Sequence, residues 1–197
     1  MPDAQLQAWA ADATALYAAD SAADRLVRMG FTPTVVGDLD SVDQTLLLGL
    51  RTVQDLDPDR TDCDKMLSLI ESDGHTAVTI AGLEGDLLDH VLASLSSLAK
   101  TTLNVRIALR TGIGHILRSG SSVTVSNAFG RRVSLIPIVH STGVSLRGVL
   151  WEVEETVMEP AGFLSVSNEG TGDVNAEIRT GAVLLYVGRD PSEAPEW

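Results

Sequence analysis

Cysteine is almost absent from the 197-residue sequence, and lysine occurs only at Lys65 and Lys100. The single cysteine, Cys63, excludes an internal disulfide framework and a metal site built from several cysteines. The sequence also lacks a run of the roughly eighteen apolar residues that a membrane-spanning helix requires, and its N-terminus has no basic region ahead of an apolar run. We therefore expect a cytoplasmic protein with no membrane partner.

Positive charge is scarce as well. The chain has 14 basic and 27 acidic residues, which gives a formal net charge of −13 at pH 7. Such a charge argues against nucleic acid or an anionic membrane as the main partner, and it favours small cationic or metal-bound ligands. A hydrophobic content of 44% over this length is enough to bury the core of one large domain or two small ones.

The first half alternates apolar helical segments with short β-branched runs that end in Asp, Gly or Ser, a pattern typical of βαβ units. Helices are predicted at 5–13, 21–30, 42–53, 61–74 and 87–100, and strands at 14–20, 32–41, 75–86 and 103–110. Thr61 or Asp62 is a good N-cap, and Gly74 a good stop, for the fourth of these helices. We expect residues 1–112 to form a Rossmann-like α/β domain with a parallel sheet, ending near "RTGIGHILRSG".

From about residue 111 the helical periodicity disappears, and short alternating runs are separated by Gly, Ser and Asn. Six strands are predicted, within 121–127, 131–139, 148–156, 161–168, 174–180 and 182–188. This pattern favours a C-terminal all-β sandwich domain at residues 113–190. Residues 191–197 are predicted to be a flexible tail.

Aspartates gather at two places in the first half. Asp20, Asp38 and Asp40 follow predicted strands, and ligands of a parallel sheet bind beyond the carboxyl ends of the strands. If the strand continues through Asp38 and Asp40, their side chains point the same way, and Asp59 and Asp62 lie three apart at a helix start. Like charges aimed into one crevice repel one another unless a cation neutralises them.

Magnesium is the natural cation, because it prefers oxygen ligands and is typically held by one or two carboxylates plus nucleotide phosphates. For any single Asp a turn or a helix cap is the more usual role, but the set favours a nucleotide triphosphate site. A third segment, "GLEGDLLDHVLASL", places Gly82 and Gly85 where backbone amides could approach a phosphate. It is neither a G-x-G-x-x-G fingerprint nor a P-loop, and a lone His90 is more often structural than catalytic.

Six segments carry a family resemblance: "AADSAADRLVRMGFTPTVVGDLDSV", "DPDRTDCDK", "GLEGDLLDH", "VSLIPIV", "GVLWEV" and "GFLSVSNE". In order and spacing they resemble the thiamine pyrophosphokinase family, over about residues 18 to 187. The resemblance implies an α/β domain followed by a β-sandwich, in a homodimer whose active sites lie between subunits. It also implies Mg²⁺-dependent transfer of pyrophosphate from ATP to thiamine, giving thiamine diphosphate and AMP.

The resemblance assigns site residues in four groups. Metal ligands are Asp38, Asp40, Asp59 and Asp62; catalytic residues are Asp38, Asp59 and Asp89; ATP-binding residues are Asp20, Ser21, Asp62, Gly85, Asp89 and His90; thiamine-binding residues are Trp151, Ser167 and Asn168. Asp59 is the candidate that orients or deprotonates the hydroxyl group. For Trp151 an ordinary role in the sandwich core is an equal alternative.

The chain departs from the family pattern at two turns. The usual acid-Gly-Gly-Ala turn is Asp20-Ser21-Ala22-Ala23, and the usual Gly-Gly-Arg is Gly85-Asp86-Leu87, so a phosphate-contacting arginine is absent there. Arg60, Arg110 or a residue of the partner subunit are candidates to replace that arginine.

Two alternatives to thiamine pyrophosphokinase remain. One is a pyrophosphokinase acting on 6-hydroxymethyl-dihydropterin, and the other is a non-catalytic thiamine-binding or regulatory protein. The β half favours thiamine over the pterin. Retention of the aspartate set favours an enzyme, because a protein without turnover has no reason to keep crowded like charges.

Overall fold

The structure is a computed structural model that describes residues 1–20, 22–40 and 42–188. Ser21 and the predicted tail at 191–197 therefore lie outside the described residues. The chain divides into two compact units. The N-terminal unit contains Pro2–Thr76 and Thr101–Leu103, and the C-terminal unit contains Ala77–Lys100 and the described residues from Asn104 onward. The boundary between these compact units differs from the predicted boundary between functional domains at residue 112, which stays a prediction.

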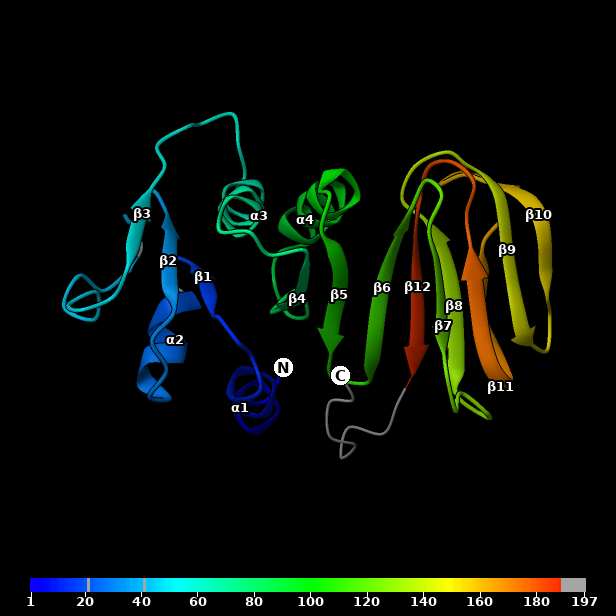
Figure 1. The fold of residues 1–197 in the computed structure, drawn as a ribbon, viewed down its shortest axis with the longest axis horizontal. Coiled ribbons are helices and arrows are strands. Elements are labelled where there is room, and N and C mark those ends of the chain that lie inside the picture. Colours follow the sequence, from blue (N-terminus) through cyan, green and yellow to red (C-terminus); the bar gives the residue numbers. More distant parts are fainter. Residues whose placement is uncertain (21, 41, 189–197) are drawn as a thin grey trace. The chain divides into compact units, whose positions relative to one another are not determined.

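The N-terminal unit is built on a small parallel sheet with the strand order β1-β2-β3 (Figure 1). Its elements are α1 (Asp3–Ala11), β1 (Tyr17–Ala19), α2 (Ala22–Arg28), β2 (Thr34–Gly37), β3 (Thr52–Gln54) and α3 (Asp62–Ser72). Val35 and Val36 of the central strand are almost completely buried, as β-branched residues of an inner parallel strand should be. Ala18, Ala23 and Leu26 pack into the same core.

Helix α3 begins and ends where the sequence predicts. The Thr61 hydroxyl accepts from the Asp64 N–H, and the Asp64 carboxylate accepts from the Thr61 N–H, which is a complete capping box. Beyond the last turn, Gly74 takes a φ of 87°, a left-handed conformation that favours glycine. The helix contacts β1 and β2 and buries Lys65, Leu67 and Ile70.

The helix predicted at 42–53 is wrong. Residues 44–49 form successive turns, and the Leu46 and Leu50 N–H groups donate to carbonyls three residues earlier instead of four. Gly49 has a φ of 85°, which interrupts helical geometry, and Leu48 is 85% exposed. The last residues of the segment form strand β3 instead, because the edge of the sheet beside β2 offers hydrogen-bond partners to their backbone.

The C-terminal unit contains a mixed sheet with the order β10-β9-β11-β8-β12-β6-β5-β4, and β7 pairs with β11. Its elements are β4 (Ala77–Ala81), α4 (Leu88–Lys100), β5 (Asn104–Leu109), β6 (Gly112–Arg118), β7 (Ser122–Val125), β8 (Arg132–Pro137), β9 (Ser141–Val149), β10 (Val153–Met158), β11 (Ser165–Glu177) and β12 (Ala182–Gly188). Strands β4 and β5 are parallel, and the other pairs are antiparallel.

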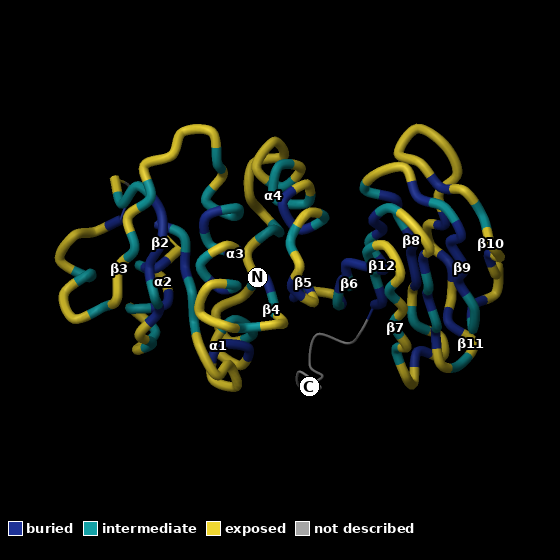
Figure 2. Tube along the Cα trace, turned by 45° about the horizontal axis from the view of Figure 1, so that its top comes forward, coloured by how far each residue is buried: buried dark blue, intermediate teal, exposed yellow. Residues whose placement is uncertain are grey.

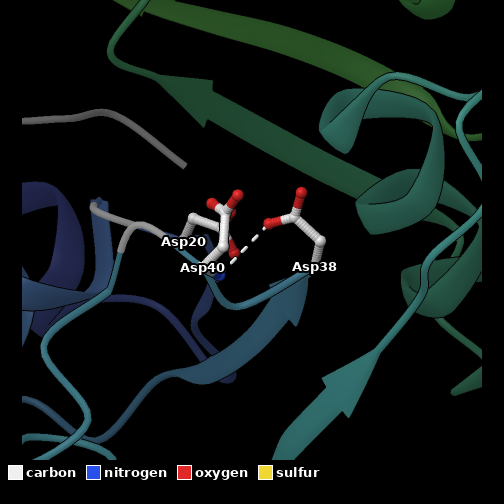
Figure 3. A group of neighbouring side chains, drawn as sticks. All are labelled: Asp20, Asp38 and Asp40. Atoms are coloured by element: carbon white, nitrogen blue, oxygen red, sulfur yellow. Dashed lines mark hydrogen bonds between the residues drawn. The ribbon is translucent and has the colours of Figure 1, made fainter.

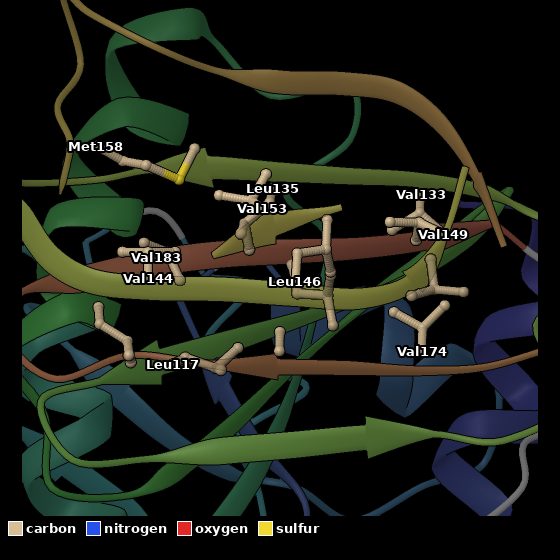
Figure 4. Close-up of a cluster of buried hydrophobic side chains, with 14 of the residues drawn as sticks. Leu117, Val133, Leu135, Val144, Leu146, Val149, Val153, Met158, Val174 and Val183 are labelled. Atoms are coloured by element: carbon tan, nitrogen blue, oxygen red, sulfur yellow. The ribbon is translucent and has the colours of Figure 1, made fainter. Parts of the chain in front are cut away.

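Strands β6 to β12 enclose one hydrophobic core. Leu135, Leu146, Met158 and Leu185 are fully buried within it, and Figure 4 labels the first three of these side chains. Figure 2 shows buried residues along β8 and β9. The stretch predicted as a domain boundary forms β6, and the two strands predicted within 161–180 are one long strand, β11.

The structure confirms the broad order of the fold: the first half contains both helices and strands, and the second half contains strands. The described strands of the first half do not form a single parallel sheet, because β1–β3 form one sheet and β4 and β5 belong to the larger one. None of the described helices has the length and apolar character needed to cross a membrane.

Candidate active site

Three carboxylates meet where two parallel strands end. Asp20 follows β1, and Asp38 and Asp40 follow β2. One oxygen of each carboxylate lies within 4.8 Å of the others, and Figure 3 shows the three side chains beside the end of β2. Asp20 is buried, Asp38 is half-buried and Asp40 is exposed, so this acid cluster has a buried base and an open side.

A turn, and not an extended strand, brings Asp38 and Asp40 together. Strand β2 stops at Gly37, and Leu39 takes a left-handed φ of 65°, so the expectation that the strand continues through both acids is wrong. The Asp40 N–H donates to the Asp38 carboxylate at 3.2 Å, which folds the turn back on itself (Figure 3). The Leu39 N–H donates to Asp20 at 3.2 Å and joins the third acid to the same turn.

Gly37 makes room for the buried member of the acid cluster. A Cβ atom on Gly37 would lie 2.1 Å from the Asp20 carboxylate oxygen, far inside van der Waals contact. The glycine of "GDLD" is therefore required by the close approach of Asp20, which comes from a neighbouring strand. This requirement is a tertiary one, since the two residues are far apart in the sequence.

The pKa values of the three acids in the cluster shift in different directions. Burial, followed by the hydrogen bond to Asp38, raises the pKa of Asp20. The Asp40 N–H and then the Asp20 carboxyl lower the pKa of Asp38, while the interaction with Asp38 raises the pKa of Asp40. These opposite shifts are expected for like charges that lie close together. Three hard oxygen donors around one point fit Mg²⁺, which would offset the repulsion between the carboxylates.

Asp62 and Asp59 are placed differently from each other. Asp62 is the first residue of α3. Its negative charge contributes to raising the pKa of both Asp20 and Asp40, so it lies close enough to interact electrostatically with the acid cluster. Asp59 precedes the N-cap Thr61, so it does not share a helical face with Asp62 as expected. Neither residue is in the described group within 4.8 Å, and their roles as ligands stay predictions.

The glycine-containing turn before α4 belongs to the C-terminal unit. Gly85 has a φ of 91°, and Asp86 accepts from the Leu87 N–H at 2.7 Å just before the helix begins at Leu88. The His90 ring lies 3.5 Å from the Asp86 carboxylate, and Asp89 is in the first helical turn. This geometry is compatible with the predicted nucleotide contacts of Gly85, Asp89 and His90, which stay predictions.

The predicted thiamine residues divide into one exposed ring and one buried clamp. Trp151 is 66% exposed, so the alternative that it is a core aromatic is wrong. Asn168 is 3% exposed; its amide donates to the Trp151 carbonyl at 2.7 Å and accepts from the Trp151 N–H at 3.2 Å. Asn168 therefore holds the turn that presents the tryptophan.

Ser167 lies next to this clamp in a strained left-handed conformation with a φ of 63°. Its hydroxyl accepts from Arg132 at 2.7 Å, and its N–H donates to the Ser134 hydroxyl at 3.1 Å. Arg132 and Ser134 also line a hollow of about 900 Å³ on the C-terminal unit, together with Val166 and Tyr186. The three predicted thiamine residues are not among the residues that line this hollow.

Two basic residues flank the start of α3, and each pairs with an acid. The Arg60 guanidinium donates to the Asp55 carboxylate at 3.1 Å, the Asp64 carbonyl at 2.9 Å and the Ser68 hydroxyl at 2.6 Å, so it is committed within its own loop and helix. Lys65 is the residue that sequence reasoning missed. It is 6% exposed, and its ammonium lies 3.3 Å from Asp62. The available signal was its position three residues after Asp62 in a chain with two lysines.

A carboxylate cluster at the ends of parallel strands, followed by a large β structure, defines a two-part α/β protein with a candidate cation site. The model of the thiamin pyrophosphokinase catalytic domain matches residues 6–109, and the model of the thiamin pyrophosphokinase vitamin B1 binding domain matches residues 121–185. The chain belongs to the thiamin pyrophosphokinase family, and it is an enzyme of that class.

Solved structures agree with this membership at the level of the fold. Thiamine pyrophosphokinase from Bacillus subtilis has a TM-score of 0.79 and 20% identity, covering 96% of this chain and 94% of that one. The Geobacillus thermodenitrificans enzyme has a TM-score of 0.75 and 20% identity, with 99% and 94% coverage. The Candida albicans enzyme has a TM-score of 0.75 and 14% identity, with 91% and 84% coverage. No curated protein sequence matches the chain significantly.

Proposed function

We propose that the chain transfers pyrophosphate from ATP to thiamine in a Mg²⁺-dependent reaction that yields thiamine diphosphate and AMP. The observation that carries the proposal is the acid cluster, three carboxylates within 4.8 Å of one another at the carboxyl ends of parallel strands. Both parts of the chain match models of the family, which supports the nature of the two substrates.

The chemistry follows from the charges involved. The hydroxyl oxygen of thiamine forms a bond to the β-phosphorus of ATP, the bond from that phosphorus to the α-phosphate oxygen breaks, and AMP leaves. The hydroxyl proton passes to a carboxylate, for which Asp59 is the candidate, or to water. Bound Mg²⁺ would neutralise charge on the phosphate oxygens. Asp38 and Asp40, with Asp59 and Asp62, would hold it.

The nucleotide and thiamine contacts complete the proposal. Asp20, Asp62, Gly85, Asp89 and His90 would contact the nucleotide, together with Ser21. The exposed face of Trp151 is suited to the cationic thiazolium ring by a cation–π interaction. Polar groups of Ser167 and Asn168 would bind the aminopyrimidine.

The assembly and location are parts of the same proposal. We propose a cytoplasmic homodimer whose active sites lie between subunits. Residues 1–112 would form a Rossmann-like nucleotide-binding domain, and residues 113–190 a thiamine-binding β-sandwich.

The test is AMP release from ATP and Mg²⁺, with and without thiamine. Asp38→Asn should abolish thiamine-dependent AMP and thiamine diphosphate while leaving the fold intact, because the side chain is half-buried and keeps its hydrogen-bonding shape. Asp43→Asn is the matched control, since the Asp43 carboxylate accepts from the N–H and hydroxyl of Thr45 in its own turn and lies outside the acid cluster, so this variant should retain activity.

The outcomes separate the alternatives. Thiamine binding without Mg²⁺ and without ATP consumption would replace the enzyme with a binding protein. AMP release with 6-hydroxymethyl-dihydropterin, but not with thiamine, would change the substrate. If Asp38→Asn keeps wild-type turnover, the acid cluster is not the catalytic metal site.

A further inference from the structure

A lysine is buried beside the acid cluster, and none of the roles given above uses it. Lys65 lies on the first turn of α3 with its side chain 6% exposed. Its ammonium is 3.3 Å from the Asp62 carboxylate, which is itself 45% exposed. The whole side chain of the lysine, including the ammonium that pairs with Asp62, is therefore almost completely covered.

An ordinary helical ion pair does not account for this arrangement. Pairs of residues three apart normally lie on the solvent-exposed face of a helix, where they contribute little to stability. A buried ammonium group costs several kcal/mol to desolvate, and a single half-exposed carboxylate offsets only part of that cost. An ammonium has three hydrogen-bond donors, and Asp62 uses one of them.

The charge of Lys65 reaches the acid cluster. It is one of the causes that lower the pKa of Asp38, whereas the charge of Asp62 raises the pKa of Asp20 and Asp40. The first turn of α3 thus places one positive and one negative group beside the three carboxylates.

Other cations of the N-terminal unit are held elsewhere. Among its described residues, Arg25 pairs with Asp3, Arg51 with Asp73 and Arg60 with Asp55, while Arg28 lines a surface hollow with Asp24 and Met29. Lys65 is therefore the cation of this unit that lies at the carboxylates.

We propose that Lys65 is a substrate-contacting cation, which donates a hydrogen bond from its ammonium to a phosphate oxygen of the bound nucleotide and supplies positive charge beside the three carboxylates. Asp62 holds the ammonium in place. When a nucleotide binds, the free donors of the ammonium meet the phosphate, and Asp62 continues to orient it. This inference rests on the proposed function, because it concerns the nucleotide of that reaction.

The proposal makes opposite predictions for metal and nucleotide. A positive charge beside the acid cluster repels Mg²⁺, so Lys65→Met should leave the affinity for Mg²⁺ alone unchanged or increase it. The same change should weaken binding of a non-hydrolysable ATP analogue with Mg²⁺ by at least about tenfold, the loss expected for one hydrogen bond to a charged group. Lys65→Gln, which keeps a donor for Asp62 but not the charge, should show the same nucleotide loss.

Calorimetric titrations of the full chain with Mg²⁺ alone, and then with the ATP analogue, test this directly. Lys100→Met is the matched control, since it makes the same change at the other lysine, at the exposed end of α4. Thermal unfolding checks the fold, and methionine suits the buried position. Nucleotide affinity within twofold of wild type in both Lys65 variants would overturn the proposal, as would a parallel fall in Mg²⁺ affinity, nucleotide affinity and stability. If the wild type itself binds no ATP analogue, the proposed function fails instead.

Discussion

Replacing Gly37 by alanine should disable the acid cluster without unfolding the protein. The new Cβ would lie 2.1 Å from the Asp20 Oδ1 atom, 2.7 Å from its Cγ and 3.2 Å from its Oδ2. Ordinary van der Waals contact begins near 3.4 Å, so the carboxylate must retreat by about 1 Å or more. The movement would break its hydrogen bond from the Leu39 N–H and take one ligand away from the other two.

The magnitude follows from this displacement. Changes to the support of metal ligands typically cost about 10-fold to 100-fold in affinity, and a misplacement of about 1 Å near the reacting groups can cost about 100-fold in rate. We expect losses of this size in Mg²⁺ affinity, measured by calorimetry, and in thiamine-dependent AMP release. Stability should fall by about 1 to 2 kcal/mol, because the clash is with the end of a side chain and the φ of 154° at Gly37 adds backbone strain.

Two variants isolate the cause. Gly74→Ala places a Cβ in open space at a φ of 87°, so it has the backbone strain without the clash and should keep wild-type Mg²⁺ affinity. In an Asp20→Ala background, Gly37→Ala should have no further effect on Mg²⁺ binding, because the group that it displaces is gone. Wild-type Mg²⁺ affinity in Gly37→Ala, or additive losses in the double variant, would refute the reasoning.

Three further predictions concern stability and pH. Asn168→Ala should lower the free energy of unfolding by about 2 kcal/mol in urea titrations, because it removes the buried clamp, whereas the exposed Trp151→Ala should keep stability and lose thiamine affinity. Arg51, then Tyr17, lowers the pKa of Asp73 to about 2, and burial, then Asp73, raises the pKa of Tyr17 to about 12. Stability should therefore fall as the pH drops from 3.8 to 2 and as it rises from 10 to 12, and Asp73→Asn should remove the acid loss. Mg²⁺ affinity should fall as the pH is lowered, since burial raises the pKa of the innermost acid of the cluster and protons compete with the cation; calorimetry in two buffers would detect their release.

Local signals predicted the elements well where neighbours in the sequence supply the stabilising contacts. The capping box and the terminal glycine of helix α3 lie within fourteen consecutive residues. Strand β2 has β-branched residues that suit a buried parallel strand. The segment at 42–53 has leucines at helical spacing, but its backbone found better partners in turns and at the edge of β2. The spacing of the leucines alone does not show that turns and pairing with β2 compete with a helix.

Residue types and order also determined the family and the presence of an acidic site, because carboxylates after successive parallel strands must approach the same sheet edge. Which acids converge was decided by the tertiary structure. Asp20 joins Asp38 and Asp40 because Gly37 leaves it space, whereas Asp59 stays outside that group. The burial of Lys65 and the exposure of Trp151 were likewise decided in three dimensions. Local geometry depends on adjacent residues, but burial and charge pairing depend on what other segments place around a side chain.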